Sequence, residues 1–118
     1  MWRSKYKNKK VTHDGRKFDS LKEKNRYIEL QLLVKAGEIF NLKCQPEFKI
    51  SKGGSLDPRT GRKMPPRKYR ADFAYIDKSG ESIVEDVKSK GTMMEPLYRL
   101  KRQLFVEQYP QFTFLEIL

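Results

Sequence analysis

Two short, strand-like stretches near the middle of the chain each carry an acid where a buried strand should be apolar. Asp72 lies within residues 69–75, and Asp86 lies within residues 83–88. An unpaired carboxylate is costly to bury, so a fold that tolerates two of them must give them partners. Since a lysine follows the second acid by two positions, the pattern predicts a metal site rather than ordinary core.

The chain has the length of a single domain with one modest core. At 118 residues, it is expected to bury roughly 65% of the surface that the unfolded chain exposes. It contains no apolar run long enough for a membrane span, and its basic N-terminus lacks the apolar segment of a signal peptide. We therefore expect a cytoplasmic, intracellular protein without membrane contact. The single cysteine, Cys44, fits a reducing compartment and is predicted to be a small core residue.

Positive charge dominates the chain but is unevenly distributed. The formal net charge is +11. Residues 1–35 hold 11 Lys and Arg against 4 Asp and Glu, and residues 49–70 hold 8 against 1. Residues 71–96 reverse this balance, with 3 against 6. Basic segments framing an acidic one are expected if cations attract a polyanion and the acids bind a metal. A solvated basic surface that binds acidic partners loosely is the alternative.

The order of predicted elements is α-β-β-β-α-β. Ser20 begins a helix that Gly37 ends, and Pro96 begins a second helix that ends near Tyr109. A turn at Lys78-Ser79-Gly80 joins two of the strands. The strands are predicted at 39–50, 68–77, 81–88 and 112–117. This order predicts an α/β (α+β) fold, a single domain over residues 13–118 whose central mixed sheet is flanked by helices.

Two basic segments lie outside these elements. Residues 1–12 are predicted to form a basic arm with interleaved aromatics, which either lies on a phosphate backbone or has no fixed structure. Residues 51–67 form a long connection rich in Gly and Pro, predicted to be a flexible loop. Loops of this length are usually functional or disordered, so a flap that clamps nucleic acid and a mobile insertion both remain open.

Each predicted helix places one charged residue on an inward-facing side. In the first helix, Glu23 lies at the head of an apolar stripe, whereas Glu29 falls on the polar face. The spacing of Ser20 and Glu23 also forms a capping box, so Glu23 has either a capping or a catalytic role, or both. In the second helix, Lys101 lies within the apolar arc. It either extends its amine to water or points towards the acids.

The predicted chemistry depends on these groups converging. Mg²⁺ prefers oxygen ligands, which Asp72, Asp86 and the carbonyl of Val87 would supply, and Mn²⁺ would substitute. Positions 86 and 88 leave the same face of a strand, so Lys88 would face the attacking water. Glu85 points the opposite way and is predicted to lie at the surface or behind the ligands. The only histidine, His13, offers no zinc-binding spacing and is predicted to be a loop residue.

These residues resemble the PD-(D/E)XK nuclease superfamily. The resemblance rests on the order of elements, on Arg70-Ala71-Asp72-Phe73, and on Asp86-Val87-Lys88 after a hairpin. Over roughly residues 5–117 the chain looks like small nucleases from phage recombination modules, which are similar to Holliday-junction resolvases and to end-cleaving subunits of transposition systems. Further matches are Phe18 to Glu23 and Gln45-Pro46. Ala71 departs from the family proline, and acid-x-Lys alone is uninformative because it also occurs at Glu47-Phe48-Lys49.

The resemblance implies a metal-dependent DNA endonuclease in phage or mobile-element recombination, acting on branched DNA such as Holliday junctions. It implies Asp72, Asp86 and Glu23 as metal ligands and Lys88 as the catalytic lysine. We expect a homodimer, because paired cuts need two sites. The residues predicted to bind DNA are Lys101, Arg70, Arg67, Lys68, Lys63 and Arg62. The alternative is a non-catalytic DNA-binding or architectural protein on the same fold.

Overall fold

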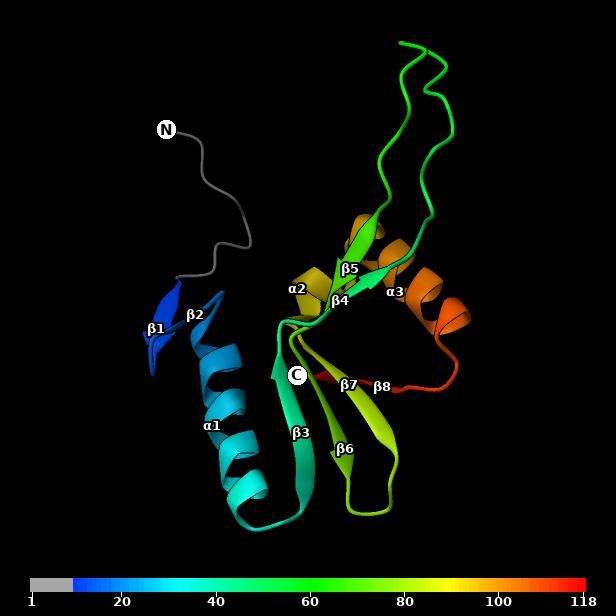
Figure 1. Ribbon diagram of the computed structural model, residues 1–118. Helices are drawn as coiled ribbons and strands as arrows, with labels where there is room; N and C mark the ends of the chain where they lie inside the picture. The colour runs from blue at the N-terminus through cyan, green and yellow to red at the C-terminus, as the bar shows by residue number, and fades with distance from the viewer. Residues whose placement is uncertain (1–9) are drawn as a thin grey trace, which may run out of the picture.

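The computed structural model describes residues 10–118, which run through strands, helices and one long projection (Figure 1). The elements in chain order are β1 (Val11–His13), β2 (Arg16–Phe18), α1 (Leu21–Lys35), β3 (Ile39–Cys44), β4 (Glu47–Lys49), β5 (Lys68–Arg70), β6 (Phe73–Asp77), β7 (Ser82–Val87), α2 (Lys90–Met93), α3 (Pro96–Gln108) and β8 (Thr113–Ile117).

The central sheet has the strand order β3-β6-β7-β8. The first three strands pair antiparallel, and β8 pairs parallel with β7 after the crossover through α3. Read along the chain, the elements of this core are α1-β3-β6-β7-α3-β8. The predicted order and the α+β class with a mixed sheet in one small domain are therefore confirmed.

Helices cover the two faces of the sheet and divide the core into two clusters. Towards α1, Tyr27 and Leu30 pack with Phe73 and Ile83. Towards α3, Phe105 and Tyr98 pack with Ala74 and Val84. Alternate residues of β7 thus enter different clusters, as the period of a strand requires. Cys44, predicted to be a small core residue, is half-buried and packs against the first cluster.

The predicted limits of α1 are confirmed by its caps. The hydroxyl of Ser20 accepts a hydrogen bond from the amide of Glu23 at 3.1 Å. Gly37 has a φ of +75° and follows the last turn, where the amide of Glu38 donates to the carbonyl of Leu33 at 2.9 Å. Such a left-handed residue after a helix favours glycine. No helix among residues 10–118 is long and apolar enough to cross a membrane.

Two of the predicted strands were too long, because each breaks in the middle. The strand predicted at 39–50 is interrupted at Gln45, which has a φ of +53°. The strand predicted at 68–77 is interrupted at Ala71 and Asp72. Beyond these breaks, β4 and β5 leave the central sheet and pair with each other. Asp72 consequently lies in a break between strands, where its side chain can turn towards the end of β7.

A small hairpin and a short helix were missing from the prediction. The hairpin of β1 and β2 turns at Asp14 and Gly15, whose φ values are +51° and +76°. Asp-Gly with two positive φ angles is a strong hairpin signal. His13 therefore lies in β1 and not in a loop, and Val11 and Thr12, predicted as part of a basic arm, also belong to β1. Residues 1–9 of that predicted arm lie outside the described residues.

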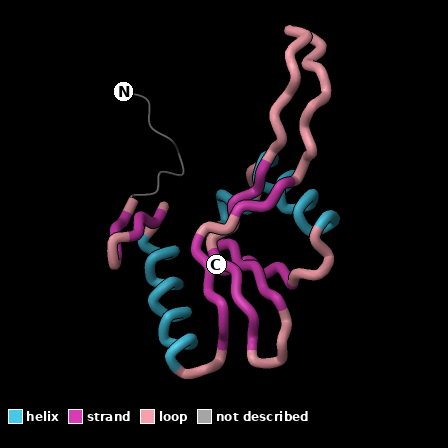
Figure 2. Tube along the Cα trace, in the orientation of Figure 1, coloured by secondary structure: helices cyan, strands magenta, loops and turns pink. Residues whose placement is uncertain are grey.

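Residues 51–67, which we call the arm, form a paired ribbon rather than a loop without structure. Figure 2 shows its two halves running side by side away from β4 and β5. The amide of Gly54 donates to Met64 at 2.8 Å, and the amide of Met64 donates to Ser55 at 2.7 Å. At Gly53, which has a φ of +70°, an added Cβ would lie 2.5 Å from the nitrogen of Pro66. At Gly53 the two halves of the ribbon therefore approach each other so closely that only glycine fits.

Candidate functional site

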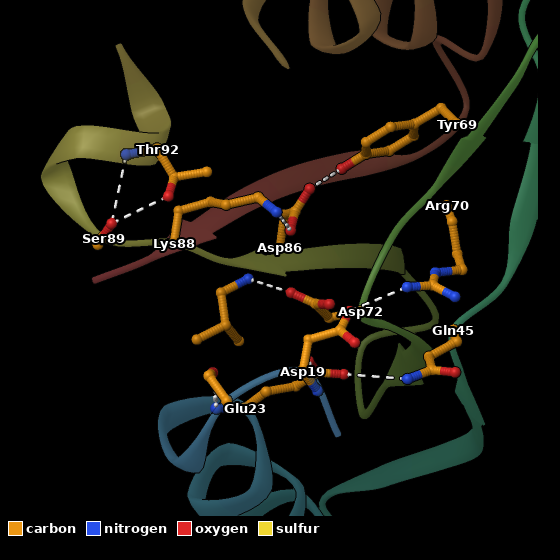
Figure 3. A network of polar contacts seen from close by, with 12 residues as sticks. Asp19, Glu23, Gln45, Tyr69, Arg70, Asp72, Asp86, Lys88, Ser89 and Thr92 are labelled. Atoms are coloured by element: carbon orange, nitrogen blue, oxygen red, sulfur yellow. Dashed lines mark hydrogen bonds and ion pairs between the residues drawn. The ribbon is translucent and has the colours of Figure 1, made fainter. Parts of the chain in front are cut away.

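A polar pocket lies where β7 ends, between the N-terminus of α1 and α2 (Figure 3). Its volume is about 140 Å³, room for a few water molecules. The structure brings together five of the predicted residues here: Asp86 lies fully buried at the adjoining end of β7, and the other four line the pocket. The lining residues are Asp19, Ser20, Lys22, Glu23, Asp72, Val87, Lys88, Ser89 and Thr92.

Asp72 is held by the backbone of β7. Its Oδ2 accepts a hydrogen bond from the amide of Val87 at 2.6 Å, and its own amide donates to the carbonyl of Glu85 at 3.1 Å. Burial, together with the neighbouring carboxylate of Asp86, raises the pKa of Asp72 to about 9. The carboxyl of Asp72 is therefore neutral near pH 7 when no cation is bound.

Asp86 has one satisfied oxygen and one that lacks a hydrogen bond. The hydroxyl of Tyr69 donates to Oδ2. Oδ1 is buried without a hydrogen-bond partner of good geometry, although Nζ of Lys88 lies 3.1 Å away as an ion pair. At 3.1 Å the opposite charges of Lys88 and Asp86 attract each other even where the angle is poor for a hydrogen bond. The contact confirms that residues 86 and 88 leave the same face of β7.

Lys88 is fixed between two groups. Besides the carboxylate of Asp86, its Nζ lies 5.1 Å from the centre of the Tyr98 ring. A cation over an aromatic face is attracted by the ring quadrupole. The amine of Lys88 is therefore held at the pocket instead of extending into solvent.

Glu23 is buried and acts as a cap. Its Oε2 accepts from the amide of Asp19 at 3.2 Å, and its Oε1 lies 3.4 Å from the side-chain nitrogen of Gln45. In a capping box the Glu23 side chain would accept from the amide of Ser20, whereas here the donor is the amide of the preceding residue, Asp19. Burial raises the pKa of Glu23. Its prediction as inward-facing is confirmed, whereas its catalytic role stays a prediction.

The carboxylates do not assemble as a three-acid metal site. Among residues 10–118 no group of three or more His, Cys, Asp or Glu is placed to hold a metal ion. Glu23 is engaged in capping, which leaves Asp72 and Asp86 as the acidic pair. The unsatisfied Oδ1 of Asp86 and the all-oxygen chemistry of the pair fit a hard cation such as Mg²⁺.

Glu85 is not at the surface, as one prediction allowed, but fully buried on the α1 side of β7. Nε and Nη2 of Arg26 donate to its two oxygens at 2.8 and 2.7 Å, and the hydroxyl of Tyr75 also donates to it. This bidentate pair joins α1 to β7 one turn after Glu23. Glu29 is exposed as predicted and pairs with Arg26 at 2.9 Å.

The residues predicted to bind DNA separate into two groups. Lys68, Arg70 and Lys101 line a second pocket, of about 340 Å³, which shares Lys88 and Thr92 with the first. Arg70 there forms an ion pair with Asp19 at 2.9 Å. The remaining three are exposed on the arm and line neither of these pockets: Arg62, Lys63 and Arg67.

Three contributors to the site escaped the sequence-based prediction. Tyr69 orients Asp86, Asp19 pairs with Arg70, and Arg26 anchors α1. Only Tyr69 had a usable signal, because a tyrosine in a buried strand needs a partner for its hydroxyl. The other two contacts bridge residues far apart in the sequence, which no local pattern reveals.

Asp72 should make the metal-free protein less stable as pH rises. The folded protein holds this proton up to about pH 9, whereas the unfolded chain loses it near about pH 4. The free energy of unfolding should therefore fall as pH rises between these limits, by at most about 1.4 kcal/mol per pH unit. Urea unfolding at several pH values in a chelator would measure this fall. Asp72→Asn, which has no proton to lose, should remove most of it; an unchanged pH dependence in this variant would contradict the assignment.

Comparison with known proteins identifies one family. Residues 3–117 match the family described as "Protein of unknown function (DUF1064)". No curated protein and no solved structure matches the chain.

Proposed function

Because the chain belongs to the DUF1064 family, whose function is not known, we propose a function from the pocket itself: a metal-dependent endonuclease that hydrolyses phosphodiester bonds in DNA. The observation that carries this proposal is the buried pair of Asp72 and Asp86 beside the fixed amine of Lys88. Two acids and a lysine beside a strongly basic surface are better explained by phosphate chemistry than by a purely structural role as an ion pair.

In this proposal Asp72, Asp86 and the carbonyl of Val87 hold Mg²⁺, with Mn²⁺ as a substitute. The ion, when bound, polarises a phosphoryl oxygen and lowers the pKa of a coordinated water. Lys88 stabilises the negative charge that develops at phosphorus or orients the water. Glu23 caps the N-terminus of α1 at the pocket. Its further role in this proposal is that of a third acidic ligand.

The second pocket would hold the neighbouring phosphates. Lys68, Arg70 and Lys101 surround a volume of about 340 Å³ that continues from the site through Lys88. Cations attract the DNA backbone without regard to sequence, so this pocket positions the strand. Arg67 and the other arm cations extend the basic surface away from the site.

The substrate structure, the cellular setting and the oligomeric state are proposed from the resemblance to the PD-(D/E)XK nucleases. We propose branched DNA such as a four-way junction as the preferred substrate, an intracellular setting in phage or mobile-element recombination, and a symmetric homodimer. Light scattering at working concentration should give twice the mass of 14.0 kDa. A mass equal to that of one chain would exclude the proposed dimer.

Cleavage of DNA by the wild-type protein tests the proposed activity. Plasmid and four-way-junction DNA should be cut in Mg²⁺ or Mn²⁺ and left intact in a chelator, because the acids need a cation to act. Ca²⁺, which has the same charge, is the matched control cation. We expect it to support DNA binding but little DNA cleavage. If neither substrate is cut in Mg²⁺ or in Mn²⁺, the proposed activity is wrong.

A non-catalytic DNA-binding protein is the second candidate. The absence of a three-acid group among residues 10–118 and the ion pair of Lys88 with Asp86 favour it. Such a protein would bind DNA with steep salt dependence. It would show no cation-dependent cutting, and Asp72→Ala would leave its affinity unchanged.

A further inference from the structure

The arm has an ordered backbone but no core of its own. Between Lys52 and Pro65 no side chain is buried, and the apolar side chains of Leu56 and Met64 are 62% and 37% exposed. A two-stranded ribbon that packs on nothing is marginally stable. The exposed apolar groups and the paired backbone together indicate a surface that functions against a partner.

Cations without acidic partners mark the kind of partner. Five exposed basic residues lie along the arm: Lys52, Arg59, Arg62, Lys63 and Arg67. None of them forms an ion pair with another described residue. The one acid of the arm, Asp57, is engaged in its turn, because its Oδ1 accepts from the amide of Arg59 at 2.7 Å. The partner is therefore strongly negative.

The tip of the arm is a fixed turn that presents a proline. The amide of Gly61 donates to the carbonyl of Asp57 at 2.8 Å, and the amide of Arg62 donates to the hydroxyl of Thr60 at 3.2 Å. Pro58 lies exposed in this turn beside Arg59. An apolar ring exposed at a hydrogen-bonded tip, next to the exposed Arg59, fits a partner that has anionic walls and an apolar interior. A DNA groove, with phosphates outside and stacked bases inside, has this character.

We propose that the arm enters the minor groove of the DNA that is cut at the pocket, and that Pro58 wedges between base pairs and bends the duplex. The minor groove attracts arginine, and apolar wedges such as proline unstack bases from that side. This inference rests on the proposed function, because it takes the DNA at the pocket as the arm's partner.

The base of the arm is joined to the site, so the length of the arm limits how far from the site its tip can contact DNA. β4 and β5 carry the arm, and Tyr69 of β5 bonds to Asp86 (Figure 3). Eight residues separate Ile50 from Pro58, so the tip extends at most about 28 Å, or about eight base pairs along a duplex. Bending at that distance would favour DNA that is already flexible or branched.

DNA bending by full-length protein carrying Asp86→Asn tests the inference without cleavage. Energy transfer between dyes at the two ends of a duplex of about 24 base pairs should rise when this protein binds. Adding Pro58→Ala should abolish most of the rise while affinity falls by less than about tenfold, since the phosphate contacts remain. Pro110→Ala is the matched control, because Pro110 is another exposed proline and follows α3. Its variant should bend DNA like the parent.

A shortened arm provides the second measurement. Replacing residues 55–63 with Asn-Gly keeps the bond between Gly54 and Met64 and forms a two-residue turn. Affinity for the duplex should fall by about tenfold or more, because three cations are lost, and netropsin, a minor-groove ligand, should compete with the parent only. Equal bending by the Pro58 and Pro110 variants, or no competition by netropsin, overturns the inference. Bending without cleavage by the wild type would instead overturn only the nuclease proposal.

Discussion

Asp86→Asn is expected to reduce metal-dependent DNA cleavage by at least about 10³-fold, the largest effect of any single change in this chain. The substitution keeps the shape of the side chain, and the hydroxyl of Tyr69 can still donate to the remaining oxygen. It removes the negative charge that would hold the cation and that now pairs with Lys88. Initial cleavage rates on plasmid DNA in Mg²⁺ would measure the loss.

Asp14→Asn is the control for this prediction. Asp14 is exposed in the β1–β2 turn at a φ of +51°, a conformation that asparagine adopts readily. Cleavage by this variant should match the wild type, and both variants should unfold at wild-type urea concentrations or above. Equal cutting by Asp86→Asn and the wild type would exclude Asp86 as a ligand.

Arg26→Met is expected to lower the free energy of unfolding by about 3–5 kcal/mol, the largest effect on stability. Methionine keeps most of the apolar stem, but Glu85, which is fully buried, loses the only cationic partner it has among residues 10–118. A carboxylate left without a counter-charge in the core is costly. Equilibrium urea unfolding at neutral pH gives the difference directly.

Glu29 allows the same arginine to be tested on its exposed side. Glu29→Gln breaks the outer ion pair of Arg26, in which Glu29 is 62% exposed, and should cost less than about 1 kcal/mol. The double variant Arg26→Met/Glu85→Leu should recover most of the loss, leaving the hydroxyl of Tyr75 as the remaining unpaired group. A loss in the double variant as large as in Arg26→Met alone would show that packing, not charge, is responsible.

The fold was largely predictable because its long elements carry local signals. The capping box at Ser20, the glycine at 37 and the turn at Lys78 to Gly80 mark boundaries that residue chemistry alone determines. The breaks at Gln45 and Asp72 were not predictable, because β4 and β5 leave the sheet to pair with each other, which is a non-local choice. The Asp14-Gly15 hairpin had a clear signal that the prediction overlooked.

The site was predictable in its members but not in its geometry. Spacing placed Asp86 and Lys88 on one face of β7 and Glu85 on the other. Whether Glu85 would be exposed or buried depended on Arg26, which lies 59 positions away in the sequence. The separation of Glu23 from the acidic pair likewise follows from its bond to Asp19, a competition that spacing cannot resolve.

Gly53 is the position in the arm that should tolerate substitution least. Its positive φ and the 2.5 Å approach of a hypothetical Cβ to Pro66 are independent obstacles to every other side chain. Gly54 shares the positive φ but has open space where a Cβ would lie, and Lys52 and Ser55 have neither constraint. In a saturation library scored for DNA binding, position 53 should therefore stand out as intolerant even of alanine, whereas Lys52 and Ser55 accept many residues.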